Sequence, residues 1–399
     1  MRILQLCHKP PFPPVDGGTK AMHNITQGLL DEGHEVKVVC ISTPKHPLRP
    51  EELPVGYRER TEIEGIFVDT SINAVDAFAD LVTADNYNVS RFFSPDLDLL
   101  LQRMLARRKF DLIHLESLFM APYIGTLRRY SKAPIVLRSH NLEHVVQQRI
   151  ASGERNPLKR PYRKLLARQL RNYEHGTLAR VNAVAAISPE DAEHFRRIHP
   201  RTPVSVVPFG VDPPAQAPPW NEGPLRFFHL GSMDWAPNEE GVRWLLREVW
   251  PLLIGRHPEA RLHLAGNHMP KDLLKAQLAG VSVEGYVHDA QAWMGERQVM
   301  VVPLLSAGGM RVKIIEGMAL GRCIISTPRG AEGIACTDGH DVLLAKDAAG
   351  FAERMAQVLR EPELARRVGR EARALVVERY SNARSLERLI ELYRKLVPA

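Results

Sequence analysis

Two cations and a carboxylate follow a pair of glycines in the C-terminal half of the chain. The residues in question are Gly308, Gly309, Arg311, Lys313 and Glu316. Glycines let an anion approach the main chain, N–H groups at a helix start attract it, and two cations add charge. Glu316 stands in an apolar run, so we expect it to be buried and to need a hydrogen-bonding partner such as a ribose diol. The pattern predicts a site for a diphosphate and a sugar hydroxyl. Alternatively, Glu316 pairs with Lys313, three residues earlier on the same helix.

The composition is that of an ordinary globular protein. The chain has 399 residues, of which 44% are hydrophobic and 25% charged, and its length predicts two or three domains. We expect no transmembrane helix, because no apolar run approaches the roughly 20 residues that a bilayer requires, and no signal peptide at residues 1–8. A cytoplasmic location follows. Cys7, Cys40, Cys323 and Cys336 form no closely spaced pair, so we expect reduced cysteines in or near the core and no metal site.

Basic residues are concentrated between residues 145 and 180. Nine Lys or Arg stand there against two Glu, a surplus that equals the net charge of +7 of the whole chain. Apolar residues recur among them at helical spacing, which predicts an amphipathic helix with a basic face. Such a face could contact an anionic membrane surface or a phosphorylated acceptor, or it could be an ordinary solvated helix surface. We expect no nucleic-acid partner, because no recognition motif accompanies the charge.

Short apolar runs alternate with helical patterns along the chain. In the first half, strands are expected at residues 2–7, 35–40, 112–115, 135–139, 183–187 and 204–208. In the second half, they are expected at residues 225–230, 261–265, 281–284, 299–303, 323–326 and 342–345. Continuous apolar runs separated by helices are typical of parallel sheets covered on both faces. The sequence therefore predicts an α/β protein with two doubly wound domains.

A proline-rich segment at residues 208–220 lies between the two series. Its five prolines disfavour both helix and central strand, as expected of a connector between domains. We predict an N-terminal domain at 1–210 and a C-terminal domain at 211–380. A final helical segment at 381–399 has no strand after it and could pack across the domain interface.

Polar and glycine residues follow the expected strands at the ends where ligands bind in open parallel sheets. Gly17 and Gly18 follow the first strand at a helix start, a phosphate-binding pattern that also occurs in purely structural turns. His140, Asn141 and Glu143 form a polar cluster directly after an apolar strand. Functional residues often occupy such loops, although His140 could equally be a hydrogen-bonded loop histidine. We expect these turns and those of the C-terminal half to face one cleft.

Five motifs are spread over almost the whole chain. They are the segment 2–18 with Pro-Pro-Val-Asp-Gly-Gly, Gly33-His-Glu-Val36, Asp111-Leu-Ile-His114, Val207-Pro-Phe-Gly-Val-Asp212, and the segment 308–319. Together they resemble the retaining, GT-B-fold glycosyltransferases of family 4. The resemblance implies two Rossmann-like domains facing each other across a cleft, with the donor nucleotide in the C-terminal domain. It is weakest at 71–100 and in the basic segment, where that family usually contacts its acceptors.

The resemblance also implies roles for individual residues in the glycine-rich segment. Glu316 matches the second Glu of the family's Glu-x7-Glu motif, which holds the ribose hydroxyls. Gly308 stands where the first Glu, which touches the donor sugar, is expected. The N–H groups of Gly309 and Met310 are therefore expected to face the sugar or the diphosphate instead.

A second departure from the family follows the first strand of the C-terminal domain. From Gly231 to residue 238 the chain lacks the Arg and Lys that the family commonly places against the diphosphate. Arg311 and Lys313 could replace them, because the leaving diphosphate gains charge as the sugar bond breaks and needs a cradle of cations or N–H groups. The resemblance further matches a base-flanking loop and a histidine near the transferred sugar, which here are Tyr286, Val287 and His140.

The implied activity is transfer of a sugar from a nucleotide diphosphate sugar to an acceptor hydroxyl, with retention and without a metal or other cofactor. The acceptor would be a sugar or a lipid-linked sugar in polysaccharide or glycoconjugate synthesis, with the enzyme peripheral at the inner face of the membrane. Residues expected near the acceptor are Asn141, Glu143, Lys159, Arg160 and Arg163.

Two alternatives remain open at this stage. A GT-B-fold nucleotide-sugar epimerase would need an acid–base pair near the sugar ring, for which only His140 and Glu143 are candidates. A non-catalytic sugar-nucleotide binding protein would be consistent with Gly308 in place of the first Glu. Turnover of a labelled donor distinguishes them from a transferase.

Overall fold

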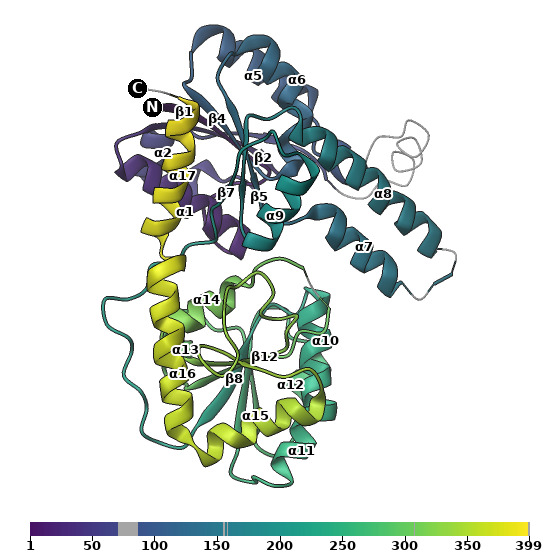
Figure 1. Cartoon of the computed structure of the whole chain (residues 1–399), viewed down its shortest axis with the longest axis vertical. Helices are drawn as coiled ribbons and strands as arrows, with labels where there is room; N and C mark the ends of the chain where they lie inside the picture. The colour runs from purple at the N-terminus through teal and green to yellow at the C-terminus, as the bar shows by residue number, and fades with distance from the viewer. Residues whose placement is uncertain (71–86, 155, 158, 307, 398–399) are drawn as a thin grey trace. The chain divides into compact units, whose positions relative to one another are not determined.

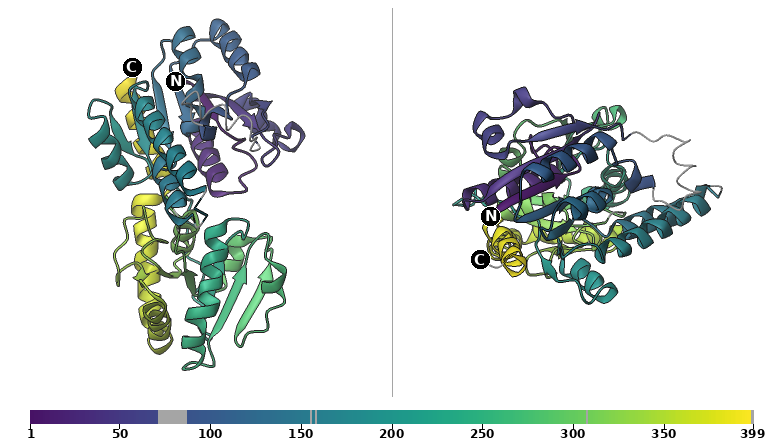
Figure 2. Two further views of the ribbon diagram at one scale, coloured as in Figure 1. Left: turned by 90° about the vertical axis from the view of Figure 1, so that its right-hand side faces the viewer. Right: turned by 90° about the horizontal axis from the view of Figure 1, so that it is seen from above.

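The computed structural model describes residues 1–70, 87–154, 156–157, 159–306 and 308–397. The chain forms two compact units. The first comprises Met1–Gly210 and Asn382–Ala399, and the second comprises Val211–Ser381. Each unit contains one parallel sheet flanked by helices (Figure 1, Figure 2). The predicted α/β class with two parallel sheets is confirmed.

The first unit has a seven-stranded sheet in the order β3-β2-β1-β4-β5-β6-β7. Its strands are β1 Arg2–Cys7, β2 Glu35–Ser42, β3 Glu64–Phe67, β4 Leu112–Glu116, β5 Ile135–Ser139, β6 Ala183–Ala186 and β7 Val204–Val206. All neighbours pair in parallel. The sequence pattern predicts six of these strands. It misses β3, an edge strand with no buried residue, because an exposed strand needs no apolar run.

Helices cover the first sheet. They are α1 Gly17–Asp31, α2 Val55–Thr61, α4 Tyr87–Ser90, α5 Pro95–Arg107, α6 Ile124–Tyr130, α7 Glu143–Gly153, α8 Lys159–Leu178, α9 Pro189–Ile198 and α17 Asn382–Leu396. Several begin at polar caps: Ser94 and Ser188 accept main-chain hydrogen bonds at the starts of α5 and α9, which satisfies N–H groups that a helix start leaves unpaired.

The last helix, α17, belongs to the first unit. Leu389, Ile390 and Tyr393 are buried in the core that α1 forms with the sheet. The helix therefore lies against α1, although the whole second unit separates the two in sequence. Whether it also packs across a domain interface stays a prediction.

The second unit has a six-stranded sheet in the order β10-β9-β8-β11-β12-β13. Its strands are β8 Arg226–Leu230, β9 Arg261–Ala265, β10 Val281–Gly285, β11 Val299–Val302, β12 Cys323–Ser326 and β13 Leu343–Leu344. Its helices are α10 Ala236–Trp244, α11 Trp250–Ile254, α12 Lys271–Leu274, α13 Ala290–Gly295, α14 Val312–Ala319, α15 Ala348–Arg360 and α16 Pro362–Leu375. All six strands are at the predicted places. β11 and β12 are short apolar runs that are buried along their whole length, as expected of strands covered on both faces.

The cysteines are free thiols. Cys7, Cys40 and Cys323 are buried, and Cys336 is partly buried. This confirms the expectation of reduced residues in or near the core. Part of the segment with the weakest family resemblance, residues 71–86, lies outside the described residues, as do Arg155 and Leu158 of the basic segment.

Candidate functional site

The start of helix α14 in the second unit brings both predicted cations to the segment that follows β8, which comprises a loop and the first turn of α10. The Nζ atom of Lys313 donates a hydrogen bond to Oδ1 of Asn238 at 2.7 Å. The guanidinium carbon of Arg311 lies 5.0 Å from the centre of the Trp235 ring, within reach of a cation–π interaction. The two cations thus contact residues 231–238, the segment that lacks Lys and Arg of its own. Their contact with a diphosphate stays a prediction.

The surroundings of Lys313 lower the pKa of its amine. Burial and the neighbouring Arg311 lower the pKa of Lys313 to about 7. His229, fully buried nearby, donates from Nδ1 to the Val301 carbonyl at 2.9 Å. Burial and Lys313 hold the pKa of His229 well below its ordinary range. An anion bound beside Lys313 would favour the protonated amine, because an opposite charge stabilises the charged form.

Glycines allow the loops around Lys313 to approach one another. A Cβ atom at Gly231 would lie 2.7 Å from Nδ2 of Asn238. Gly266 has φ +146°, and a Cβ atom there would lie 1.8 Å from the Gly231 carbonyl oxygen. Gly231 is therefore required by the packing of the loop that holds Lys313. Gly266, which stands in no motif of the sequence, is required by the same close approach.

The other donor-site candidates of the second unit lie on the loops around α14 and β10. Glu316 is partly exposed, which corrects the expectation that it is buried: one side of α14 carries the apolar residues and leaves Glu316 at their edge. Gly308 and Gly309 are partly buried and Met310 is buried, and Gly309 has a φ of +80°, a conformation that glycine adopts without strain. After β10, the Tyr286 side chain is 66% exposed and Val287 is partly buried.

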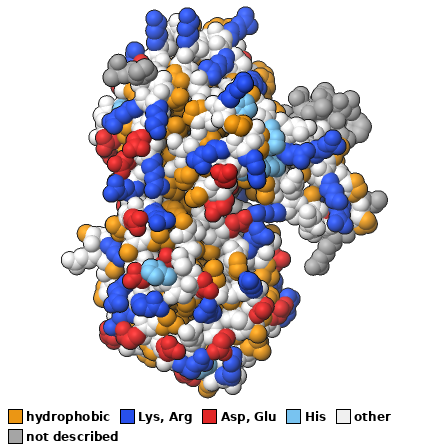
Figure 3. Space-filling view, in the orientation of Figure 1, with side chains coloured by type: hydrophobic (Ala, Val, Ile, Leu, Met, Phe, Trp, Pro, Cys, Tyr) orange, Lys and Arg blue, Asp and Glu red, His pale blue; other side chains and the backbone are white. Residues whose placement is uncertain are grey.

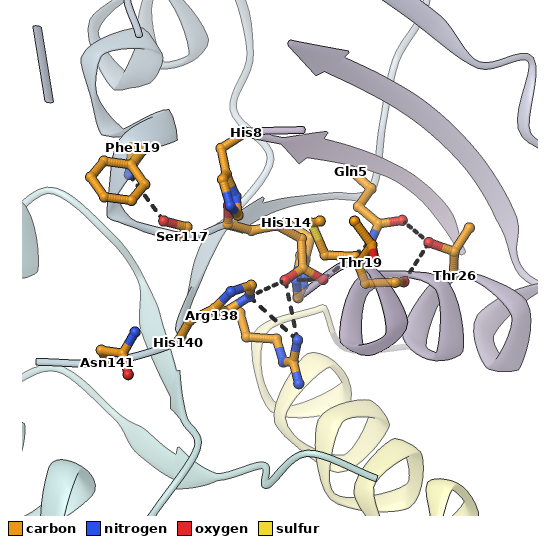
Figure 4. Close-up of polar contacts among 12 residues, drawn as sticks. Gln5, His8, Thr19, Thr26, His114, Ser117, Phe119, Arg138, His140 and Asn141 are labelled. Atoms are coloured by element: carbon orange, nitrogen blue, oxygen red, sulfur yellow. Dashed lines mark hydrogen bonds and ion pairs between the residues drawn. The ribbon is translucent and has the colours of Figure 1, made fainter. Parts of the chain in front are cut away.

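A buried carboxylate organises the polar residues at the end of β4 in the first unit. Nε2 of His140 lies 2.8 Å from Oε2 of Glu116, and Nη1 of Arg138 donates to the same oxygen at 3.3 Å. On the other oxygen, Nε2 of Gln5 donates at 3.1 Å and Nε2 of His114 lies 3.0 Å away. Figure 4 shows His114, Arg138 and His140 converging on one carboxyl group. We call these five residues the Glu116 cluster.

Contacts within the cluster and burial determine the protonation states of Glu116 and His140. Burial alone would raise the pKa of Glu116, but Arg138 and His114 outweigh it and hold that pKa well below its ordinary value. Burial lowers the pKa of His140, against the opposing effect of Glu116. At neutral pH a neutral His140 therefore donates from Nε2 to an ionised Glu116, which leaves Nδ1 as a hydrogen-bond acceptor. A carboxylate that orients an imidazole in this way is a common arrangement at catalytic sites.

The loop before α1 packs against the same cluster. His8 contacts the Glu116 carbonyl oxygen through Nδ1 at 3.0 Å, and its ring centre lies 5.7 Å from that of His140. Burial, followed by His140, lowers the pKa of His8 to about 3. Two neutral histidines thus lie side by side at the carboxyl ends of β1 and β5, where ligands bind in parallel sheets.

Gly17 and Gly18 form the first turn of α1. The Asp16 carboxylate caps this helix through the Thr19 N–H at 2.8 Å and accepts from Nζ of Lys9 at 2.7 and 2.8 Å. A Cβ atom at Gly18 would lie 3.0 Å from that Nζ. Lys9 therefore lies close to Gly18, and an aspartate already occupies the helix start where a phosphate was expected. A role of the two glycines in donor binding stays a prediction.

Comparison with known proteins identifies the family. The family model described as Glycosyltransferase Family 4 matches residues 15–214, and the model described as Glycosyl transferases group 1 matches residues 224–361. The chain belongs to glycosyltransferase family 4. This confirms the resemblance inferred from the five motifs.

The individual relatives of this family 4 protein are distant in sequence. An "Uncharacterized 44.6 kDa protein in cps region" of Klebsiella pneumoniae is 24% identical over 135 residues, which cover 32% of this chain and only 35% of that relative. Among solved structures, sucrose-phosphate synthase from Thermosynechococcus elongatus is 18% identical, with a TM-score of 0.71 and 99% coverage of both chains. Anabaena HepE in complex with UDP and glucose is 13% identical, with a TM-score of 0.65 over 99% of this chain and 100% of HepE. These likenesses show the GT-B fold.

The expected acceptor residues of the family 4 protein occupy two places in the first unit. Asn141 and Glu143 follow His140 at the start of α7, and Nδ2 of Asn141 donates to Oε1 of Glu143 at 3.4 Å. Burial, followed by Glu174, raises the pKa of Glu143 to about 7. The structure thus places Asn141 and Glu143 next to the Glu116 cluster.

Lys159, Arg160 and Arg163 instead lie on α8. Lys159 and Arg160 are exposed at its start, whereas Nε of Arg163 pairs with Glu154 at 2.9 Å. Figure 1 shows α7 and α8 as a projecting hairpin, and Figure 3 shows Lys and Arg side chains beside hydrophobic ones on it. In the described part of the chain, no helix is both long and apolar enough to traverse a bilayer.

Sequence reasoning missed the centre of the first-unit site. Glu116 is an acidic residue at the end of an apolar strand, directly after the Asp111–His114 motif, and that position was a usable signal. Tyr393 gave no local signal: its hydroxyl contacts Nδ1 of His114 from a helix 279 residues away in sequence. Ser117, with φ +90°, adds an uncommon backbone conformation beside Glu116, of a kind that often marks functional sites.

Proposed function

We propose that the protein transfers a sugar from a nucleotide diphosphate sugar to an acceptor hydroxyl. The observation that carries the proposal is the position of Arg311 and Lys313 against residues 231–238, the segment after β8 in which the family's usual cations are missing. Membership of glycosyltransferase family 4 supports the reaction class. The fold likeness to HepE, which was solved with UDP and glucose, supports a nucleotide-sugar donor.

The donor diphosphate would bind at the start of α14. The first N–H groups of a helix have no intrahelical partner, and the N-cap residue Arg311 gives α14 no side-chain hydrogen bond. These N–H groups, together with the Lys313 and Arg311 cations, would stabilise the charge that grows on the diphosphate as the sugar leaves. Glu316, one turn further along α14, would accept hydrogen bonds from the ribose hydroxyls.

The family resemblance implies that His140, a member of the Glu116 cluster, contacts the transferred sugar. His140 is held by Glu116 with Nδ1 as an acceptor, so it can take a hydrogen bond from a sugar hydroxyl. We assign it to positioning the transferred sugar. In this proposal the acceptor oxygen attacks the face from which the diphosphate departs, the departing phosphate takes the acceptor proton, and the configuration is retained. No step requires a metal ion.

The hairpin of α7 and α8 would bind an anionic membrane surface, where a lipid-linked acceptor would lie. Ile150 and Leu165 are each 42% exposed and Tyr162 is 37% exposed, next to the exposed Lys159 and Arg160. Basic residues beside exposed apolar ones are suited to an anionic bilayer surface. A lipid-linked sugar in polysaccharide or glycoconjugate synthesis is the acceptor class that this surface favours.

Turnover of labelled nucleotide sugars tests the proposal. A thermal-shift screen against UDP, GDP, ADP and dTDP selects the donor base, because a bound ligand raises stability as RT ln(1 + [L]/Kd). The selected donor is then incubated with acceptors, and the anomeric configuration of the product is determined by NMR. A stabilising nucleotide without any product would identify a binding protein, and an altered free sugar nucleotide would identify an epimerase.

Replacement of both cations tests the donor site itself. The double variant R311A/K313M is expected to lose at least about 100-fold in turnover, comparable to the loss of one oxyanion donor. The matched control is R329A/K346M, which removes two cations from the same unit at other loops. Unreduced turnover of the first variant would show that another group holds the diphosphate.

Flotation with vesicles tests the surface. The protein is expected to bind vesicles that contain phosphatidylglycerol and to lose binding in K159E/R160E, whereas binding to pure phosphatidylcholine should be weak. Equal binding of wild type and variant would contradict a role of α8.

A further inference from the structure

Three histidines from three helices of the first unit converge on one point. His144 lies in α7, His175 in α8 and His194 in α9. One nitrogen atom of each side chain lies within 4.8 Å of the corresponding atoms of the other two. The ring centres of His144 and His194 are 5.2 Å apart, and those of His144 and His175 are 5.5 Å apart.

Two of these histidines each have one ring nitrogen without a hydrogen-bond partner among the described residues. Nε2 of His175 and Nε2 of His194 are buried and have no hydrogen-bond partner. Buried polar atoms nearly always have a partner, and an exception calls for an explanation such as an ion. Two unpaired imidazole nitrogens beside a third histidine provide a set of ligands that metals bind.

The third histidine is oriented by a carboxylate. Nδ1 of His144 contacts Oε2 of the buried Glu174, which leaves Nε2 of His144 as the nitrogen for a ligand. Glu174 is itself fixed, because it accepts from the main-chain N–H groups of Glu143 at 3.2 Å and His144 at 3.3 Å. A carboxylate that holds one ring nitrogen while the other binds a metal is the usual outer shell of a metal-bound histidine.

We propose that His144, His175 and His194 bind one divalent transition-metal ion, with zinc the preferred ion, and that Glu174 positions His144 for it. Imidazole nitrogen suits zinc, which favours about 2.0–2.1 Å to each nitrogen in a tetrahedral arrangement. Nitrogens on such an ion lie about 3.3–3.5 Å apart, so side-chain rotation has to shorten separations of up to 4.8 Å by up to about 1.5 Å. His175 and His194 are partly exposed, so a water molecule can take the fourth position.

One existing contact changes when the metal binds. Nη2 of Arg197 lies 3.3 Å from Nδ1 of His194 in an exposed position. A metal on Nε2 places the ring hydrogen on Nδ1, and Arg197 then turns to solvent. The loss is small because the contact is solvated.

The ion would join α7, α8 and α9. Helix α7 begins directly after His140 and Asn141, so the metal would restrain the helical hairpin and the polar loop at the Glu116 cluster together. This role is structural and does not depend on the proposed sugar transfer. The sequence shows no metal motif, because the three histidines come from separate helices and not from one closely spaced group.

Metal binding is measured on protein freed of metals with EDTA and dialysed. Calorimetry with ZnCl₂ is expected to give one ion per chain, and CoCl₂ to give the intense visible absorption of a tetrahedral site. Zinc is also expected to raise the thermal midpoint, as any ligand of the folded state does. Absence of zinc uptake by the wild-type protein would overturn the proposal.

Variants distinguish this site from chance binding to surface histidines. H175N and H194Q are expected to lose the ion and the cobalt spectrum, and E174Q to bind about 10–100-fold more weakly, as for other outer-shell changes. The control H288N, at an exposed histidine of the second unit, is expected to bind zinc like the wild type. R197Q is a second control beside the site. It removes no proposed ligand, so it is expected to retain the zinc ion. Equal zinc binding by wild type, H175N and H194Q would show that the three histidines form no site.

Discussion

Lys313 and Asn238 are joined by a hydrogen bond of 2.7 Å between Nζ and Oδ1. The bond connects the start of α14 to the first turn of α10, and the two residues are 75 positions apart in the sequence. It brings a cation to residues 231–238, a segment that has no Lys or Arg of its own. Because Asn238 is buried and fixed by a second hydrogen bond to the Ser232 carbonyl at 2.8 Å, the amine is held in place before any ligand binds.

Binding of a nucleoside diphosphate is expected to take up a proton and to weaken as the pH rises above about 7. The free protein loses the Lys313 proton as the pH passes through its pKa of about 7, whereas a bound diphosphate favours the charged amine. The bound complex therefore holds more protons than the free protein at pH 8. Calorimetry at pH 8 in two buffers with different ionisation enthalpies measures this uptake.

The control for this linkage is K313R. An arginine keeps its charge at every accessible pH, so the variant should bind without proton uptake, and its affinity should vary less between pH 7 and pH 9. Identical pH profiles for K313R and wild type would show that Lys313 does not titrate with the ligand.

Replacement of Gly231 by alanine is expected to weaken both the fold of the second unit and nucleotide binding. The new Cβ atom would lie 2.7 Å from Nδ2 of Asn238, so Asn238 has to move and releases Lys313. We expect a loss of about 1–3 kcal/mol in the free energy of unfolding, typical of overpacking, measured by denaturant titration. G56A is the control, because nothing lies within 4 Å of a Cβ atom at Gly56. A stable G231A with wild-type nucleotide affinity would contradict this account.

Removal of the Tyr393 hydroxyl is expected to destabilise the first unit. That hydroxyl contacts Nδ1 of the fully buried His114. Y393F leaves the imidazole nitrogen without this partner, at a cost of about 1–3 kcal/mol, measured by chemical unfolding. Y130F is the matched control: the Tyr130 hydroxyl donates to Oε1 of Gln102 at 3.2 Å in an exposed contact, so a change under about 0.5 kcal/mol is expected. Equal effects of the two substitutions would show that the buried contact adds no stability.

How well a feature of this structure can be predicted depends on how far apart in the sequence its interacting residues are. Buried strands such as β1 and β12 are predictable because their apolar runs are local. The motif at Arg311 and Lys313 is also local, so the cations could be named in advance. The contact of Lys313 with Asn238 could not be predicted, because Asn238 lies in another helix, 75 residues earlier in the sequence.

The same limit applies to the first unit. His140 is predictable from its place after an apolar strand, whereas the contact of Tyr393 with His114 depends on where the last helix packs. The three histidines of α7, α8 and α9 are likewise assembled only by helix packing. The prediction that Glu316 is buried was wrong, because apolar neighbours in the sequence do not show which side of a helix a residue occupies.

Substitution of Glu316 by alanine is expected to weaken nucleotide binding about 10–100-fold. A hydrogen bond to a charged group contributes about 1.5–3 kcal/mol, and in our proposal the Glu316 carboxylate accepts from the ribose hydroxyls of the donor. Isothermal calorimetry with the selected nucleoside diphosphate measures the affinity of E316A. The decisive comparison uses the analogue that lacks the 2′-hydroxyl and 3′-hydroxyl groups. Wild type and E316A should bind this dideoxy analogue equally weakly, because neither can form the contact. A loss in E316A that is as large for the dideoxy analogue as for the ribonucleotide would show that Glu316 acts through the structure of α14 and not through the ribose.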